Sequence, residues 1–166
     1  MVGIIDFRKS GGQKIPDIVQ YVKDYVQTHS NIEVVVTTDS QNKAHKTVFC
    51  TAVIMYDMGD GEHGHGAHCI YRKWDVPIYG EERELERLRQ EVTESIQVAQ
   101  QLRENGVKVD IVDIDINPES GDKDQNKSNQ IFAEAKASVE WAGFNCTWKG
   151  YGNCFASFPD KIVKRS

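Results

Sequence analysis

Several acidic residues stand where predicted strands end, and closely grouped carboxylates are the oxygen ligands that Mg²⁺ and Mn²⁺ prefer. The stretch "VVVTTDSQ" runs three valines and two threonines into Asp39. Because side chains alternate along a strand, Val35, Thr37 and Asp39 share one face, with Asp39 at its C-terminal edge. Ligands of open α/β sheets bind outside the carboxyl ends of parallel strands. Taken alone, however, Asp39 is more typical of an Asp-Ser turn that bonds a nearby backbone N–H.

The stretch "VKVDIVDIDIN" repeats this pattern and contains a second acid near its end, Asp115. Its odd-numbered positions share one face, which changes from apolar to acidic at Asp113 and Asp115. The two strands are predicted to be parallel neighbours, because the long helix between them suits a crossover connection. Asp115 would then occupy a position equivalent to that of Asp39, at the carboxyl end of the neighbouring strand. A strand end followed by the turn sequence "INPESGD" explains Asp115 when it is taken alone.

A third acid, Glu91, lies on the long helix predicted over residues 81–105. It stands at the margin of the apolar stripe, with the small residue Ser95 one turn further on, so we expect its side chain to face inward. Glu94 lies among polar neighbours on the same helix and is predicted to be solvated. A salt bridge between Glu91 and Arg87 is the simpler explanation of the inward acid.

The fourth acid, Asp160, follows a proline in "ASFPDK". Pro159 is not expected deep inside a helix, so a short helix is predicted to begin with Ser157 as its N-cap. Asp160 then lies in the first turn, where a negative charge interacts favourably with the helix dipole. This interaction with the helix dipole fully explains Asp160 as a structural residue. Only the presence of the other three acids suggests that it is also part of a functional site.

The elements that must position these acids follow from hydrophobic periodicity and turn residues. The predicted order is one N-terminal helix followed by βββαβαβα, which is an α/β fold with a mixed five-stranded sheet flanked by helices. The expected elements are a helix at 15–28 with Pro16 in its first turn, strands at 33–38, 47–56 and 67–74, the helix at 81–105 closed by Gly106, a strand at 107–117, a helix from about 126 to 141, a strand at 145–148 and a helix at 157–164.

Length and composition favour one globular domain over residues 1–166, with an N-terminal extension and helix at 1–30 and a core at 33–166. The chain has 39% hydrophobic and 27% charged residues, unlike disordered proteins. No apolar run has the roughly 18 residues that span a bilayer, and no secretory signal is recognisable, so we expect a cytoplasmic protein without a membrane partner. Its scattered cysteines form no C-x-x-C pair and are predicted to be free thiols: Cys50, Cys69, Cys146 and Cys154.

The net charge of −5 gives no overall attraction to nucleic acid, so any such contact must be local. The sequence offers small basic clusters for it, although each is also typical of an ordinary solvated surface. Lys149, after the last predicted strand, is one further candidate for a phosphate contact. The clusters are Lys43, His45 and Lys46; Arg72 and Lys73; and Lys161, Lys164 and Arg165.

The order of the elements and the positions of the four acids resemble the ribonuclease H-like superfamily. That fold carries one carboxylate each on the first strand, the first core helix, the fourth strand and the last helix. More narrowly, "TTDSQ", the E-x-x-x-S of Glu91 and Ser95, "DIN" followed by "KSN", and the closing "AS" and "DK" look like a small bacterial family of ribonuclease H-like proteins. The resemblance covers about residues 33–166, and the short, proline-interrupted last helix departs from it.

The resemblance implies a divalent-metal-dependent nuclease that hydrolyses phosphodiesters in RNA, an RNA/DNA hybrid or another nucleic acid. Two charges 4 Å apart repel by about 4 kcal/mol at an effective dielectric of 20, so four converged carboxylates require a cation or protonation. Two Mg²⁺ or Mn²⁺ ions satisfy this and assist an in-line displacement. Their expected ligands and catalytic residues are Asp39, Glu91, Asp115 and Asp160, supported by Ser40, Ser95, Asp113 and Lys149.

The sequence is also compatible with other functions. A ribonuclease H-like fold that binds nucleic acid or a protein without cutting is the main alternative, because a fold does not guarantee a function. His63, His65 and His68 in "GEHGHGAHC" suggest a metal site, but the glycines fit a hairpin loop better and no further ligand is patterned nearby. An aspartyl phosphatase and a metal-dependent adhesion module are excluded by the spacing of their motifs. Oligomeric state is not predictable.

Overall fold

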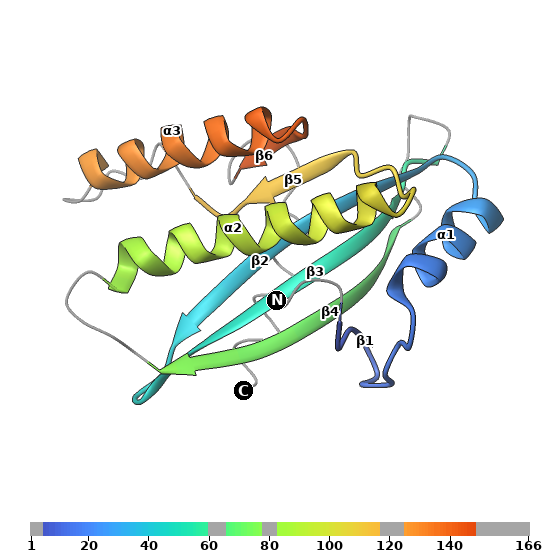
Figure 1. Cartoon of the computed structure of the whole chain (residues 1–166), viewed down its shortest axis with the longest axis horizontal. Coiled ribbons are helices and arrows are strands. Elements are labelled where there is room, and N and C mark those ends of the chain that lie inside the picture. The colour runs from blue at the N-terminus through green and yellow to red at the C-terminus, as the bar shows by residue number, and fades with distance from the viewer. Residues whose placement is uncertain (1–4, 60–65, 78–82, 117–124, 149–166) are drawn as a thin grey trace.

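The computed structural model describes residues 5–59, 66–77, 83–116 and 125–148, which form one mixed six-stranded sheet and three helices (Figure 1). The sheet has the strand order β1-β4-β3-β2-β5-β6. The elements are β1 (Arg8–Lys9), α1 (Ile18–Thr28), β2 (Ile32–Asn42), β3 (Lys46–Asp57), β4 (Gly66–Pro77), α2 (Arg83–Glu104), β5 (Ile111–Ile114), α3 (Gln125–Trp141) and β6 (Asn145–Trp148).

The sheet has one strand more than predicted, because two residues before α1 pair with the edge of β4. Arg8 lies opposite Tyr71 and Lys9 opposite Ile70 in antiparallel register. A pair of basic residues has no strand periodicity of its own, so the pairing comes from tertiary contact. The buried side chain of Phe7 packs into the main core next to this strand.

Strand β2 continues to Asn42, so Asp39 lies inside a strand rather than at its edge as predicted. β2 pairs with β3 from Ile32 through Asn42, and Asp39 lies opposite Cys50. The pairing persists because the hairpin is tight: Thr47 donates a hydrogen bond to the Asn42 side chain at 2.7 Å. The turn that the sequence suggested at Asp39 and Ser40 therefore comes a few residues later.

Strand β5 is parallel to β2, as predicted, but spans only Ile111–Ile114 instead of residues 107–117. Val107 and Val109 are buried in the core, although they precede the strand. Asp110 joins the start of β2 through its side chain, which accepts a hydrogen bond from the Val34 N–H at 2.9 Å. The Asp110 N–H also donates to the Val34 carbonyl oxygen at 2.9 Å, so packing and these two bonds fix the residues before β5.

The helix ends follow local capping rules. Helix α1 begins at Ile18, because the Asp17 side chain accepts a hydrogen bond from the Gln20 N–H as an N-cap, and Pro16 therefore lies outside the helix and not in its first turn. Helix α2 ends as predicted before Gly106, which has a φ of +89°. The Val107 N–H bonds the Leu102 carbonyl at 2.9 Å, which completes a Schellman motif.

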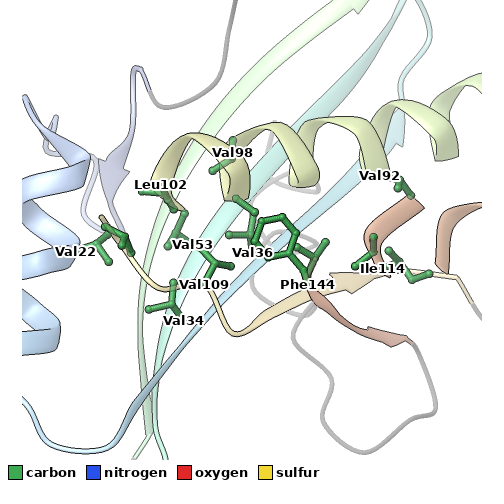
Figure 2. Close-up of a cluster of buried hydrophobic side chains, with 14 of the residues drawn as sticks. Val22, Val34, Val36, Val53, Val92, Val98, Leu102, Val109, Ile114 and Phe144 are labelled. Carbon is green, nitrogen blue, oxygen red and sulfur yellow. The ribbon is translucent and has the colours of Figure 1, made fainter. Parts of the chain in front are cut away.

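All three helices contribute to one large core on a single face of the sheet (Figures 1 and 2). Val34 and Val36 of β2 lie on this face together with Val98 of α2. Val35, between the two valines, instead belongs to a small cluster made by strand residues on the other face. This alternation decides the direction of every later side chain on β2, because Ser40 faces the helices and Asp39 faces away from them.

None of the described helices is long and apolar enough to cross a membrane.

Several predictions concern parts of the chain outside the described residues. The predicted last helix and its acid, Asp160, lie outside the described residues, as does Lys149. So do two of the loop histidines, one cysteine and the last basic cluster: His63, His65, Cys154, Lys161, Lys164 and Arg165.

Candidate metal-binding site

Asp39 is nearly buried, at 7% exposure, and its carboxylate accepts a hydrogen bond from the Ser40 backbone N–H at 2.8 Å. The simpler explanation from the sequence, a bond to a neighbouring N–H, is therefore correct for one of its oxygens. Thr37 of β2 lies opposite Asp113 of β5, and β5 ends one residue later. Asp39 thus stands on β2 just beyond the point where β5 no longer pairs with it.

Asp113 and Asp115 mark the end of β5. Asp113 is buried and accepts hydrogen bonds from the hydroxyls of Thr37, at 3.5 Å, and Thr147 on the two neighbouring strands. Burial raises the pKa of Asp113 to about 6; the bond from Thr147 lowers it, and the nearby charge of Asp115 raises it further. Asp115 follows the strand and is half-buried. The two acids differ in role, because Asp113 is held by hydroxyls while Asp115 extends past the strand end.

Glu91 of α2 faces the sheet, as predicted, and is 4% exposed. The Ser40 hydroxyl donates a hydrogen bond to its Oε1. Burial raises its pKa well above the ordinary value; the Ser40 bond and Arg87 lower it, whereas the charges of Asp39 and Asp115 raise it. The three acids thus come from β2, α2 and the end of β5, yet lie near enough for their charges to interact.

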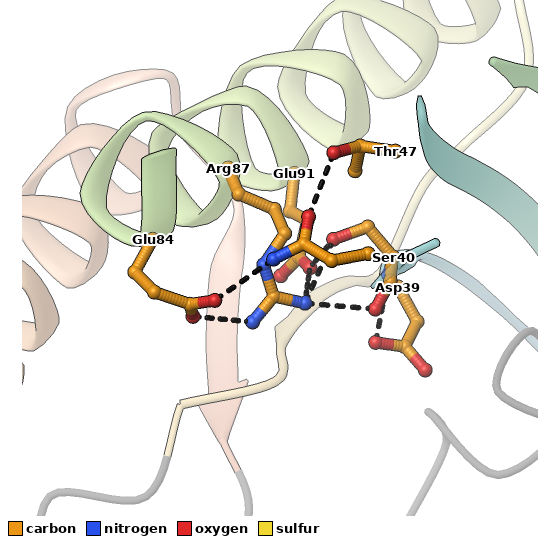
Figure 3. Close-up of polar contacts among 7 residues, drawn as sticks. Asp39, Ser40, Thr47, Glu84, Arg87 and Glu91 are labelled. Atoms are coloured by element: carbon orange, nitrogen blue, oxygen red, sulfur yellow. Dashed lines mark hydrogen bonds and ion pairs between the residues drawn. The ribbon is translucent and has the colours of Figure 1, made fainter. Parts of the chain in front are cut away.

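Arg87 supplies positive charge on the helix side of this group (Figure 3). One helical turn before Glu91, its Nη1 lies 4.0 Å from the Glu91 Oε1 and donates to the Ser40 carbonyl oxygen at 2.9 Å. Its Nη2 donates to Glu84 at 2.6 Å. Burial lowers the pKa of Arg87, but the bond to Glu84 and the charges of Glu91, Glu84 and Asp39 together raise it. The salt bridge expected as the simpler role of Glu91 is therefore present.

The donor chemistry of these acids fits Mg²⁺ or Mn²⁺, because all of their candidate ligand atoms are hard oxygens. The buried Glu91 also lies near two like charges that a divalent cation would offset. Among the described residues, however, no group of three or more His, Cys, Asp or Glu side chains is already arranged to hold a metal ion. Glu91 is instead held by Ser40 and lies next to Arg87, so a bound cation would have to share its carboxylate with the charge of Arg87 or replace it.

The fold and the acids agree with one comparison. A family model described as Ribonuclease H-like matches residues 14–164, which is most of the chain. The chain belongs to the ribonuclease H-like family. No curated protein and no solved structure matches it. The family match begins before α1, so in this ribonuclease H-like protein the first helix lies within the matched region.

One acid that the sequence assigned to solvent is buried in the ribonuclease H-like protein. Glu94 is 5% exposed, and its Oε2 lies 3.8 Å from Nη1 of Arg72, itself 6% exposed. Neither of these two atoms has a hydrogen-bond partner. The burial of Glu94 was not expected from its polar neighbours on the helix, because its partner Arg72 comes from β4, 22 residues earlier in the sequence. Arg72 is therefore not a surface cation as the basic cluster suggested.

The remaining predicted residues divide between structure and surface. The Ser95 hydroxyl lies 2.7 Å from that of Thr38, which in turn lies 2.9 Å from the hydroxyl of Thr51. This buried chain joins α2 to the sheet and does not touch the acids. Lys73 is exposed on the same face as Asp39, two strands away, with Cys50 between them in register. Lys46 forms a surface ion pair with Asp75 at 2.9 Å.

Proposed function

We propose that this protein is a divalent-metal-dependent phosphodiesterase that hydrolyses RNA, an RNA/DNA hybrid or another nucleic acid. The observation that supports it most is the electrostatic coupling of Glu91 to both Asp39 and Asp115, three acids from separate elements. Grouping these acids, two of which are buried, is costly unless a cation offsets their charge. Membership of the ribonuclease H-like family supports the proposed reaction class, and the grouping of the acids supports the proposed position of the site.

In this proposal Asp39, Glu91 and Asp115 hold Mg²⁺ or Mn²⁺, with Asp160 as the fourth ligand. When bound, the metal would lower the pKa of a water molecule and stabilise the leaving oxygen. The protein's own residues orient the ligands. Ser40 fixes Glu91 by its hydroxyl and Asp39 by its backbone N–H.

Asp113 extends this support to the other side of the site. Its hydrogen bonds from Thr37 and Thr147 keep the end of β5 in register with both neighbouring strands, which sets the position of Asp115 two residues later. Lys73, exposed on the Asp39 face, is a described candidate for contact with a phosphate backbone. Ser95 supports the site only indirectly, by joining α2 to the sheet, and Lys149 remains a candidate for phosphate contact.

The test is cleavage of labelled single-stranded RNA, DNA and RNA/DNA hybrid in Mn²⁺, Mg²⁺ and EDTA. The Asp39→Asn variant should lose activity on the order of 100-fold or more, because it removes a charged ligand without changing its size. Asp24→Asn, on the exposed face of α1, is the matched control and should cleave like the wild type. Full Mn²⁺-dependent activity in Asp39→Asn would show that the site is wrong.

A non-catalytic nucleic-acid-binding or protein-binding module is the second candidate. It is favoured by the contacts of Glu91, whose Oε1 is already engaged by Ser40 and lies near Arg87. This reading predicts that the wild type binds a hybrid duplex or a protein partner equally well in EDTA and Mn²⁺ and cleaves nothing. Cleavage that requires Mn²⁺ and is lost in Asp39→Asn excludes it.

A further inference from the structure

Arg87 is held on the helix side of the acidic site by hydrogen bonds to Ser40 and Glu84 (Figure 3). Its guanidinium donates to the carbonyl and hydroxyl oxygens of Ser40 at 2.9 and 3.2 Å, and to Glu84 at 2.6 Å. The side chain is 20% exposed, and its Nε is buried without a hydrogen-bond partner. Hydrogen bonds to Ser40 and Glu84 therefore hold the two terminal nitrogens, while Nε is left without a partner.

The same cation stands next to the oxygen that a metal would need. Nη1 of Arg87 lies 4.0 Å from Oε1 of Glu91, and the Ser40 hydroxyl donates to that oxygen. Glu91 is nearly inaccessible to solvent, so its carboxylate has little room to serve two cations at once. Positive charges at this distance repel strongly where water is scarce.

We propose that Arg87 is the internal counter-ion of the acidic site and competes with a divalent cation for Glu91, an inference that rests on the proposed function. Without metal, Arg87 offsets the charges of Glu91 and Asp39. With metal, its guanidinium withdraws from Glu91 and keeps its bond to Glu84. Glu84 suits this second role, because its side chain is 62% exposed at the protein surface and already accepts from Nη2.

The competition gives Arg87 two opposite effects that a purely structural residue would not have. Removing its charge should destabilise the metal-free protein, because Glu91 and Asp39 lose a positive charge that interacts with both. The same change should strengthen metal binding, because the cation no longer displaces a positive charge. Arg87 is thus a positioning residue that sets how much divalent cation is needed to load the site.

The experiment measures Mn²⁺ binding to the full chain by calorimetry and by the electron paramagnetic resonance signal of free Mn²⁺. Thermal unfolding in EDTA and in Mn²⁺ is recorded for the same proteins. Arg87→Gln should bind Mn²⁺ about ten times more tightly than the wild type and should melt at a lower temperature in EDTA. Arg89→Gln is the matched control, because Arg89 lies on the same helix and pairs with Glu134 at 3.4 Å near the surface. It should match the wild type in Mn²⁺ affinity.

Two further variants separate charge from folding. Arg87→Lys keeps the charge and should stay within about threefold of the wild-type affinity. Glu84→Gln removes the surface partner that receives Arg87 and should weaken Mn²⁺ binding by about threefold, even if Arg87→Gln does not fold. The competition is overturned if the wild type binds Mn²⁺ and Arg87→Gln binds it equally or more weakly, or if Glu84→Gln is unchanged. If no protein in the series binds Mn²⁺, the proposed metal site fails and this inference fails with it.

Discussion

Replacing Asp113 by asparagine should remove a defined part of the pH dependence of folding. Asp113 is 3% exposed, and its pKa rises from 3.8 to about 6 in the folded protein. The folded state therefore binds more protons than the unfolded chain between pH 4 and 6, so stability falls as the pH rises through this window. Two pKa units at 1.36 kcal/mol each amount to about 3 kcal/mol, of which about 2 kcal/mol falls between pH 4 and 7.5.

Asparagine should keep both hydrogen bonds, because the hydroxyls of Thr37 and Thr147 can donate or accept. The comparison is urea unfolding of wild type and Asp113→Asn at pH 4, 5, 6 and 7.5, with EDTA present to exclude metal. Relative to the wild type, the variant should gain about 2 kcal/mol between the lowest and highest pH, or roughly 4–8 °C in melting temperature. A difference between the two proteins that stays constant with pH would refute the assigned burial of this carboxylate.

Thr147→Val provides an opposite change in the same measurement. The Thr147 hydroxyl lowers the pKa of Asp113, so its removal should raise that pKa further. The loss of stability between pH 4 and 7.5 should then be larger than in the wild type. The two variants together distinguish the titration of Asp113 from that of other acids, which contribute equally to all three proteins.

Two further predictions concern groups that are not proposed as metal ligands. Arg72→Met or Glu94→Gln alone should destabilise the protein by about 3–5 kcal/mol in urea unfolding, because each leaves a buried charge unpaired. The double variant Arg72→Met with Glu94→Met removes both charges and should recover most of this loss. The pKa of His68 is lowered by burial and by the charges of Lys9 and His29, so stability should rise as the pH increases toward 6.5, the value for an unfolded histidine. Relative to the wild type, His68→Gln should lose stability between pH 5 and 7.5 in melting curves, because it lacks this contribution.

The sequence predicted the helices and strands well where their patterns were long. The apolar spacing of α2 and its closing glycine placed both the helix and the inward direction of Glu91. The parallel pairing of β2 and β5 followed from the helix between them. These features depend on local periodicity and on chain connectivity, which can be read from one sequence.

The errors arise where contacts between distant residues decide the outcome. Glu94 appeared solvated because its helix neighbours are polar, but Arg72 from β4 covers it. Asp39 appeared to end a strand because Asp-Ser favours turns, but pairing with β3 extends the strand to Asn42. Arg87 was recognised as a salt-bridge partner of Glu91, while its bonds to the backbone and hydroxyl of Ser40 depend on packing that no pattern shows.

The two-residue strand β1 has a consequence for association between copies of the protein. β4 is twelve residues long and uses one side to pair with β3, which leaves its other side as a template for β-strands of other chains. β1 covers this side at Ile70 and Tyr71, and the buried Phe7 fixes it there. Further along, the exposed charges of Lys73 and Asp75 discourage another strand from adding. The segment before α1 thus protects the sheet against edge-to-edge aggregation.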